Sequence, residues 1–439
     1  MAREKSESRD KSRDLAIKIL GKVLGEEALS LDEAFAQVID APRVNPEPIQ
    51  RSWLLEICSG VLRWKGRLDF IIDSVSLKKK PTGWLRRAML TGAYQLVAQD
   101  RVPPAIVVSE MVDLIKSKEG HAPAKFVNAA FRKVADHAMK WRELDFPIDK
   151  PNQQAAWASL PQWMWNRLVA QHGKDWAANF ARACLERPVT WIRVKGAGPT
   201  AASLQDWSEE GPIRGARKCI EGGPIVEKSG FESGDFFVQD ISSQTLVAEI
   251  SSEVKSGLPK EEIENLTALD LCAAPGGKTA GLSWNSFDVT ATDRDGERMK
   301  LLEETIRRVS PRVRVEPLKA VAALPDQHLV WVDAPCTGTG IIRRHPDVRW
   351  SKMEKDLFTL DKLQAQLLDQ GWSKVRSGGF LAYTVCSVLK EEGPEQLQKF
   401  LDRVGVGRAR VVKQWFLVPQ EAPYGDGFWG VLIQKVLLQ

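Results

Sequence analysis

Cysteine is scarce in this sequence, and its few copies are widely spaced. The six cysteines form no CxxC pair and no Cys/His cluster at the spacing of zinc ligands. We therefore expect no structural zinc and no other bound metal. Thiols that are not paired also suit a reducing compartment, where they stay free to react. The cysteines are Cys58, Cys184, Cys219, Cys272, Cys336 and Cys386.

Long apolar runs are also missing. No stretch of 18 apolar residues occurs, and the charged N-terminus lacks the apolar segment of a signal peptide. These absences predict a cytoplasmic protein with no membrane contact. The sequence gives no sign of oligomerisation, so a monomer is expected.

The charge is close to balanced. The formal net charge is +5 in 439 residues, and the basic excess lies within residues 1–140. Such an excess suits a polyanionic partner, but an ordinary solvated surface explains it equally well. At this length one hydrophobic core does not keep growing, so two or three domains are expected.

The spacing of apolar residues divides the N-terminal half into segments. Residues 1–14 alternate charges without apolar content, which predicts a disordered arm. Residues 15–140 carry apolar residues at helical spacing without strand-like alternation, which predicts an all-α bundle. A polar, proline-bearing linker is predicted at 141–153. A mixed α+β connecting region is predicted at 154–250.

The pattern changes in residues 251–439, where short apolar runs are separated by helical stretches. This alternation is typical of a parallel sheet covered by helices on both faces. The predicted strands are 266–272, 288–292, 313–315, 329–332 and 380–385, with 410–412 and 428–436 closing the sheet edge.

The string LDLCAAPGGKT (269–279) has the pattern of a strand, a glycine-rich turn and a helix. Gly276 and Gly277 would let the backbone approach a ligand closely, and the helix start would offer free N–H groups. Asp293 ends the next predicted strand, where a carboxylate that binds ribose hydroxyls is expected. Together these features favour an adenosine-containing cofactor. A phosphate-binding loop would require glycine where Cys272 stands, so an NTPase is disfavoured.

Two further strings end predicted strands. They are DAPCTGTG (333–340) and YTVCS (383–387). In an open α/β sheet, ligands bind at the carboxyl ends of the strands, so Cys336 and Cys386 would face one pocket with the cofactor. Either cysteine alone would more often be an inert buried residue. Their joint placement favours chemistry.

A pair of thiols beside a methyl donor suits one reaction in particular. Carbon 5 of cytosine is a poor nucleophile until a thiolate adds at carbon 6. One cysteine would serve this addition, and a second would assist release. A carboxylate at Asp333 would hold the N3 and exocyclic amine of the base. The target base would have to be flipped out or presented in single-stranded RNA.

These strings resemble motifs of the NOL/Sun-type RNA cytosine-C5 methyltransferases, and nearly the whole chain is similar to the bacterial 16S ribosomal RNA methyltransferase B (Sun/Fmu) group. The strings are LDLCAAPGGKT, DAPCTGTGIIRRHPDVRW and YTVCS, with RSWLLEICSGVLRWKGRLD (51–69) and KFVNAAFRKV (125–134) similar to a NusB domain. The resemblance implies a NusB-like helical RNA-binding bundle at 15–140, a connecting α+β region and a Rossmann-type methyltransferase domain at 251–439. It also implies 16S ribosomal RNA as partner and S-adenosylmethionine as cofactor.

Residue roles follow from the same resemblance. It implies that Cys386 is the nucleophile, that Cys336 aids product release and that Asp333 is a third catalytic residue. The implied cofactor contacts are Cys272, Ala273, Ala274, Pro275, Gly276, Gly277, Lys278, Asp293 and Asp333. Where the family has a carboxylate after the third strand, this chain has Glu316-Pro-Leu-Lys-Ala320. A non-catalytic RNA-binding assembly factor and a transfer RNA methyltransferase therefore stay open as alternatives.

Overall fold

The computed structural model describes residues 2–41, 44, 47–76, 80–99, 102–143, 151–196, 204–294 and 296–436. The chain forms two compact units. The first comprises Met1–Glu186 and Ile342–Glu354, and the second comprises Arg187–Ile341 and Lys355–Gln439. This division differs from the predicted one, because the region 154–250 is split at Glu186 and 141–153 separates no units. Residues 144–150 of that predicted linker lie outside the described residues.

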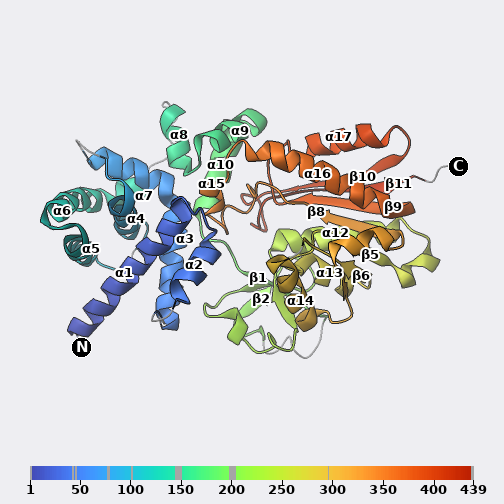
Figure 1. Ribbon diagram of the computed structural model, residues 1–439, viewed down its shortest axis with the longest axis horizontal. Coiled ribbons are helices and arrows are strands. Elements are labelled where there is room, and N and C mark those ends of the chain that lie inside the picture. Colours follow the sequence, from blue (N-terminus) through green and yellow to red (C-terminus); the bar gives the residue numbers. More distant parts are fainter. Residues whose placement is uncertain are drawn as a thin grey trace. The chain divides into compact units, whose positions relative to one another are not determined.

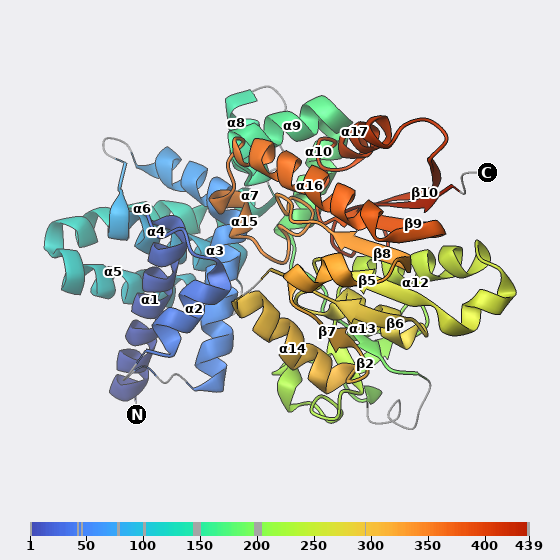
Figure 2. The ribbon, with the colours of Figure 1, turned by 45° about the vertical axis from the view of Figure 1, so that its right-hand side comes forward.

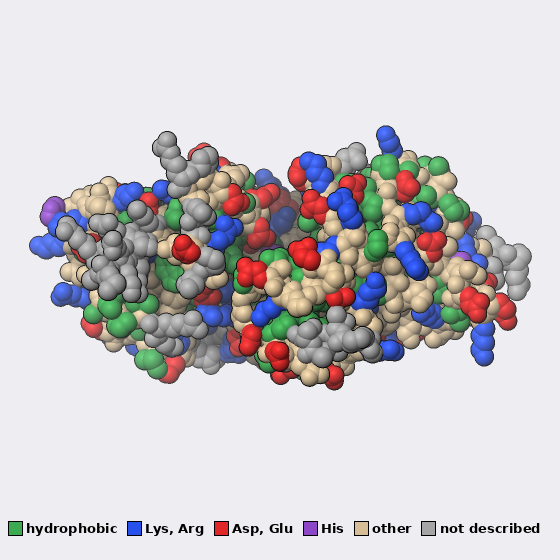
Figure 3. All heavy atoms as spheres, turned by 90° about the horizontal axis from the view of Figure 1, so that it is seen from below, with side chains coloured by type: hydrophobic (Ala, Val, Ile, Leu, Met, Phe, Trp, Pro, Cys, Tyr) green, Lys and Arg blue, Asp and Glu red, His purple; other side chains and the backbone are tan. Residues whose placement is uncertain are grey.

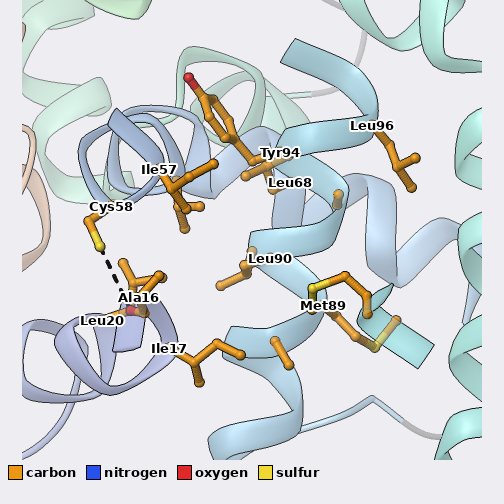
Figure 4. Close-up of a cluster of buried hydrophobic side chains, with 14 of the residues drawn as sticks. Ala16, Ile17, Leu20, Ile57, Cys58, Leu68, Met89, Leu90, Tyr94 and Leu96 are labelled. Carbon is orange, nitrogen blue, oxygen red and sulfur yellow. Dashed lines mark hydrogen bonds between the residues drawn. The ribbon is translucent and has the colours of Figure 1, made fainter. Parts of the chain in front are cut away.

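The first unit is helical, as the apolar spacing predicts (Figure 1). Its helices are α1 (Ala2–Leu24), α2 (Leu31–Ile39), α3 (Pro48–Val75), α4 (Gly83–Ala98), α5 (Pro104–Glu119), α6 (His121–Asp136), α7 (Ala138–Glu143), α8 (Pro151–Ala158), α9 (Gln162–His172), α10 (Lys174–Leu185) and α15 (Val348–Ser351). Figure 4 shows the core where α1, α3 and α4 meet, with Leu20, Ile57 and Leu90 buried among them. No helix within the described ranges is long and apolar enough to span a bilayer.

Helix α1 starts at Ala2, although the charge pattern predicts a disordered arm over 1–14. Ser12 and Arg13 are buried. Arg13 donates to the side chain of Gln95 at 3.1 Å and forms an ion pair with Glu110 at 2.5 Å. Charge alternation alone therefore misplaces the end of this predicted arm, because Arg13 has partners on other helices.

The first unit also contains a segment from far along the chain, residues 342–354. Arg349 is fully buried there. Its guanidinium donates to the backbone carbonyls of Arg63 at 3.1 Å and Ser159 at 3.0 Å, and also to that of Cys184. The indole N–H of Trp350 donates to the carbonyl of Leu62 at 2.8 Å. This segment comes directly after the DAPCTGTG string in the sequence. The chain therefore passes from the second unit into the helical unit just after the string.

The second unit contains two sheets. A four-stranded sheet of order β2-β3-β1-β4 precedes a seven-stranded sheet of order β10-β11-β9-β8-β5-β6-β7 within the described residues. The smaller one comprises β1 (Trp191–Val194), β2 (Ser208–Glu210), β3 (Ala216–Cys219) and β4 (Phe236–Val238). The larger one comprises β5 (Thr267–Asp270), β6 (Asp288–Ala291), β7 (Arg314–Val315), β8 (Gln327–Asp333), β9 (Val375–Val385), β10 (Ala409–Leu417) and β11 (Phe428–Lys435). Strands β5 to β9 are parallel, and β11 and β10 extend the sheet antiparallel.

Alternating side chains of the large sheet enter two separate cores. Ala268, Trp331 and Ala382 pack on one face with α12 (Ile241–Ser256), α13 (Gly277–Trp284) and α14 (Glu297–Val309). Leu269 and Val330 pack on the other face with α16 (Asp356–Ser373) and α17 (Pro394–Val404). Figures 1 and 2 show these helix groups on opposite sides of the sheet. Burial of both faces explains the continuous apolar runs of its strands. The predicted Rossmann-type fold is confirmed.

Candidate active site

The glycine-rich turn connects β5 to α13. Gly276 has a φ of +105°, which glycine adopts without strain, and α13 begins at Gly277. The first N–H groups of this helix are therefore available to a ligand. Strand β5 has β6 on one side and β8 on the other, where the strand order reverses. The predicted ligand residues 272–277 thus lie where open α/β sheets bind their ligands.

Two buried oxygens near this turn have no hydrogen-bond partner among the described residues. They are Asp270 Oδ1 and Thr292 Oγ1, at the ends of β5 and β6. The other oxygen of Asp270 accepts a hydrogen bond of 2.6 Å from the Thr279 hydroxyl. Burial, with a smaller contribution from the charge of Asp333, raises the pKa of Asp270 to about 7. Unpartnered buried oxygens are uncommon in proteins, so the turn suits a polar ligand.

Asp293 lies at the end of β6, as predicted, and its carboxylate holds the turn. One oxygen accepts from the backbone N–H of Ala274 at 2.9 Å, and the other accepts from that of Arg294 at 2.8 Å. Arg298 adds two bonds to the carboxylate, at 2.9 and 3.0 Å. No sequence signal singled out Arg298. A ribose hydroxyl at Asp293 would share this carboxylate with the guanidinium.

Asp333 and Lys278 form an ion pair between the glycine turn and the end of β8. The Lys278 Nζ lies 2.6 Å from Asp333 Oδ2, and the Thr384 hydroxyl donates to Oδ1 at 2.8 Å. Burial by itself would lower the pKa of Lys278, but the charge of Asp333 outweighs it and the pKa is raised. The Cys386 sulfur contributes to this rise. Lys278, predicted as a cofactor contact, is therefore also a cation next to the sulfur.

The two predicted catalytic cysteines are adjacent. Cys336 follows β8 and Cys386 follows the neighbouring parallel strand β9, and their Sγ atoms are 3.1 Å apart. The hydrogen bond to Cys386 and burial together raise the pKa of the Cys336 thiol. The Cys336 thiol is therefore held within hydrogen-bond distance of a neighbouring sulfur. Lys278 thus places a positive charge near the Cys386 sulfur.

The remaining predicted groups are placed as follows. Cys272 is in the glycine turn, and burial raises the pKa of its thiol, so it is a poor nucleophile. Over the described residues, no group of three or more His, Cys, Asp or Glu is arranged to hold a metal ion.

Comparison with known proteins gives two family matches. Residues 259–422 match the model of the 16S rRNA methyltransferase RsmB/F family, and residues 10–136 match the NusB family. Ribosomal RNA small subunit methyltransferase B of Cronobacter sakazakii is 30% identical over 375 residues, covering 80% of this chain and 82% of that protein. The protein of the same name from Salmonella arizonae is 28% identical over 398 residues, covering 86% and 88%.

Solved structures share the fold. The crystal structure of PH0851 matches with a TM-score of 0.69 and 22% identity, covering 97% of this chain and 99% of that one. The structure of NSun6 from Pyrococcus horikoshii with SFG matches with a TM-score of 0.54 and 16% identity, covering 63% and 99%. The chain therefore belongs to the 16S rRNA methyltransferase RsmB/F family, and it is an RNA methyltransferase with an N-terminal NusB-family region.

Proposed function

We propose that the protein methylates carbon 5 of a cytosine in 16S ribosomal RNA, with Cys386 as the nucleophile and S-adenosylmethionine as the methyl donor. The observation that carries this proposal is the pair of sulfurs 3.1 Å apart beside Asp333 and the glycine turn. A methyltransferase acting on a nucleophilic oxygen or nitrogen needs no such pair. A carbon that must first be activated by covalent addition needs a nucleophile such as a thiolate, and a second thiol beside it suits the release of the adduct.

Different residues of this chain would carry out the successive steps of the reaction. The Cys386 sulfur adds to carbon 6 of the base, with the ammonium of Lys278 nearby. Asp333 accepts a hydrogen bond from the exocyclic amine, and from N3 once N3 carries a proton, so the added electron density is directed to carbon 5. Once carbon 5 has formed its bond to the methyl group of the sulfonium donor and the methyl–sulfur bond has broken, a base removes the carbon 5 proton. The C5=C6 double bond then re-forms, and the C6–S electron pair returns to Cys386. The thiol of Cys336 stabilises the departing sulfur by hydrogen bonding.

The cofactor would be held by residues 272–278 and by Asp293. S-adenosylmethionine supplies an electrophilic methyl group when bound there. The unpartnered Asp270 Oδ1 and Thr292 Oγ1 support a polar ligand at this position. The NSun6 structure contains SFG, an analogue of S-adenosylmethionine, which supports the same cofactor here.

The ribosomal substrate rests on the relatives, which are named for the small ribosomal subunit. The surface charge gives no independent support. Figure 3 shows acidic and basic side chains interspersed over the visible face. This face therefore offers no broad positive surface to the RNA.

The first experiment combines binding and transfer. The protein is titrated calorimetrically with S-adenosylmethionine and then incubated with unmodified small-subunit RNA that carries tritium at carbon 5 of cytosine. We expect the cofactor to bind. We also expect one tritium to be released for each methyl group transferred. Methyl transfer without tritium release would exclude carbon 5, and no cofactor binding would favour a non-catalytic RNA-binding factor. Transfer only to transfer RNA would exclude the ribosomal substrate.

The roles of the two cysteines are tested by substitution. We expect Cys386→Ala to abolish methyl transfer while cofactor binding persists, because the thiol contacts the base. We expect Cys336→Ala to accumulate a covalent adduct with RNA, seen as a slow band on a denaturing gel. Cys219→Ala is the control, because this half-buried cysteine lies on the smaller sheet. Adduct in Cys386→Ala and normal release in Cys336→Ala would reverse the assignment.

A further inference from the structure

The peptide groups on both sides of Cys336 are held by two buried side chains that the proposed mechanism does not use. Gln364, on α16, donates from Nε2 to the carbonyl of Pro335 at 3.0 Å. Glu392, between β9 and α17, accepts from the backbone N–H of Thr337 at 2.8 Å and from its hydroxyl at 2.5 Å. Gln364 also donates to Glu392 at 3.2 Å. The two side chains thus clamp Pro335 and Thr337 around the cysteine.

Hydroxyl groups connect this clamp to the segment of Cys386. Ser387, the next residue, lies within hydrogen-bond distance of Thr339 at 2.9 Å and of Thr337 at 3.4 Å. The backbone N–H of Gly340 donates to the carbonyl of Cys386 at 3.0 Å. All of these hydroxyl-bearing side chains are fully buried. The clamp therefore fixes the Cys336 loop against the end of β9.

The two sulfurs are not held equally firmly. Cys386 directly follows β9, which pairs along its length with β8 and β11. Cys336 follows a loop after β8, and its flanking peptides bond to side chains rather than to a neighbouring strand. Loss of the clamp would therefore displace Cys336 and leave Cys386 in place.

Burying a carboxylate without compensation is costly, and Glu392 is 1% exposed. Burial accordingly raises the pKa of Glu392, and its oxygens accept from Thr337 and Gln364, so the side chain serves as an acceptor for the loop. We propose that Gln364 and Glu392 are positioning residues that set the separation of the two sulfurs and thereby the rate at which the covalent RNA intermediate is released. This inference rests on the proposed cytosine mechanism.

The test compares two buried glutamines. Gln364→Met removes the bonds to Pro335 and Glu392. Gln396→Met is the matched control, because Gln396 is also fully buried and donates to a backbone carbonyl, that of Asp361 at 2.8 Å. Both substitutions remove a fully buried side-chain amide that donates to a backbone carbonyl. Of the two glutamines, only Gln364 contacts the Cys336 loop.

Each variant, the wild type and Cys336→Ala react with S-adenosylmethionine and unmodified small-subunit RNA, and adduct and released product are separated on a denaturing gel. In Gln364→Met we expect about tenfold more adduct than in wild type, with a first-turnover methylation rate within about twofold. Cofactor affinity should not change. Gln396→Met should release product like wild type, although both variants lose similar thermal stability.

The Glu392 variants give an independent readout. Glu392→Ala removes both acceptors and should accumulate more adduct than Gln364→Met. Glu392→Gln keeps an oxygen for the Thr337 N–H and should restore most of the release. If Glu392→Ala does not fold, the comparison of the two glutamines still decides the question.

Equal adduct in Gln364→Met and Gln396→Met would overturn the positioning role. Adduct in Cys336→Ala alone, with wild-type release in Gln364→Met, would leave the proposed function intact and reject only the clamp. Absence of adduct even in Cys336→Ala would instead reject the release step on which both rest.

Discussion

Asp270 combines full burial with like charges nearby. The carboxyl group is buried at the end of β5, and the charges of Asp333 and Asp293 add to the effect of burial. The hydrogen bond from Thr279 and the charge of Lys278 oppose it only in part. The pKa of Asp270 is therefore raised to about 7, so this side chain titrates near neutral pH in the folded protein.

This shift predicts a pH dependence of stability. The unfolded chain releases the Asp270 proton near pH 4, but the folded chain releases it only near pH 7. Between these values the folded state binds more protons, so stability falls as the pH rises, by up to about 1.4 kcal/mol per pH unit. Urea unfolding of wild type and Asp270→Asn at several pH values measures this difference. A difference that stays constant from pH 4 to pH 8 would contradict the prediction.

Sequence spacing was informative for residues that end strands. Cys336, Cys386 and Asp293 were placed correctly at strand ends because the carboxyl ends of parallel strands meet at one edge. Gln364 and Glu392 could not be found in this way. Their partners lie 29 and 55 residues away along the chain. Helical periodicity can predict that a residue is buried, but it cannot predict which distant loop the side chain contacts.

At the scale of elements, the loop after β8 passes very close to the segment that leads into β11. The backbone N–H of Gly427 donates to the carbonyl of Gly340 at 2.8 Å. A Cβ at Gly340 would lie 2.0 Å from the Gly427 carbonyl oxygen. The Gly340 N–H in turn donates to the carbonyl of Cys386, so glycine at 340 permits the approach of two backbones next to the site.

Gly340→Ala should therefore displace the loop. We expect methyl transfer to fall by about a hundredfold, because a shift of about 1 Å in a reacting group is enough for such a loss. Gly222→Ala is the control, because a Cβ there meets no heavy atom within 4 Å. Initial rates on small-subunit RNA measure both variants. Wild-type rates in Gly340→Ala would show that the loop adapts without cost.

The strands of the large sheet could be predicted from apolar runs, but their order could not. Strand β11 lies between β9 and β10, although it is the last of the three in the chain. Periodicity identifies which segments are strands, whereas pairing depends on contacts between distant residues. The start of α1 was misplaced for a similar reason, since Arg13 is buried by partners on other helices.

At the scale of the whole molecule, one side chain anchors the returning segment 342–354. Arg349 is buried, and within the described ranges its guanidinium bonds only to backbone carbonyls of the helical unit. Burial lowers the pKa of Arg349 to about 10, so the side chain stays charged at neutral pH. The fork shape of the guanidinium allows several carbonyls to be satisfied at once.

Arg349→Lys should destabilise the protein strongly. Lysine has too few donors in this geometry, so buried carbonyls lose partners and the free energy of unfolding should fall by at least about 3 kcal/mol. Arg51→Lys is the control, because Arg51 forms an exposed ion pair with Asp40, and its substitution should cost less than about 1 kcal/mol. Denaturant unfolding measures both. Similar losses in the two variants would contradict the anchoring role.

The position of the segment 342–354 in the chain also limits how recombination can exchange the two units. A gene fragment that encodes the chain from Arg187 onward would still encode 342–354, whose buried Arg349 finds its carbonyl partners at Arg63, Ser159 and Cys184. A fragment ending at Glu186 would lack that segment. No single recombination point therefore exchanges one unit for a foreign counterpart intact. Descendants of this gene must pass on the two units together, or replace 342–354 at the same time.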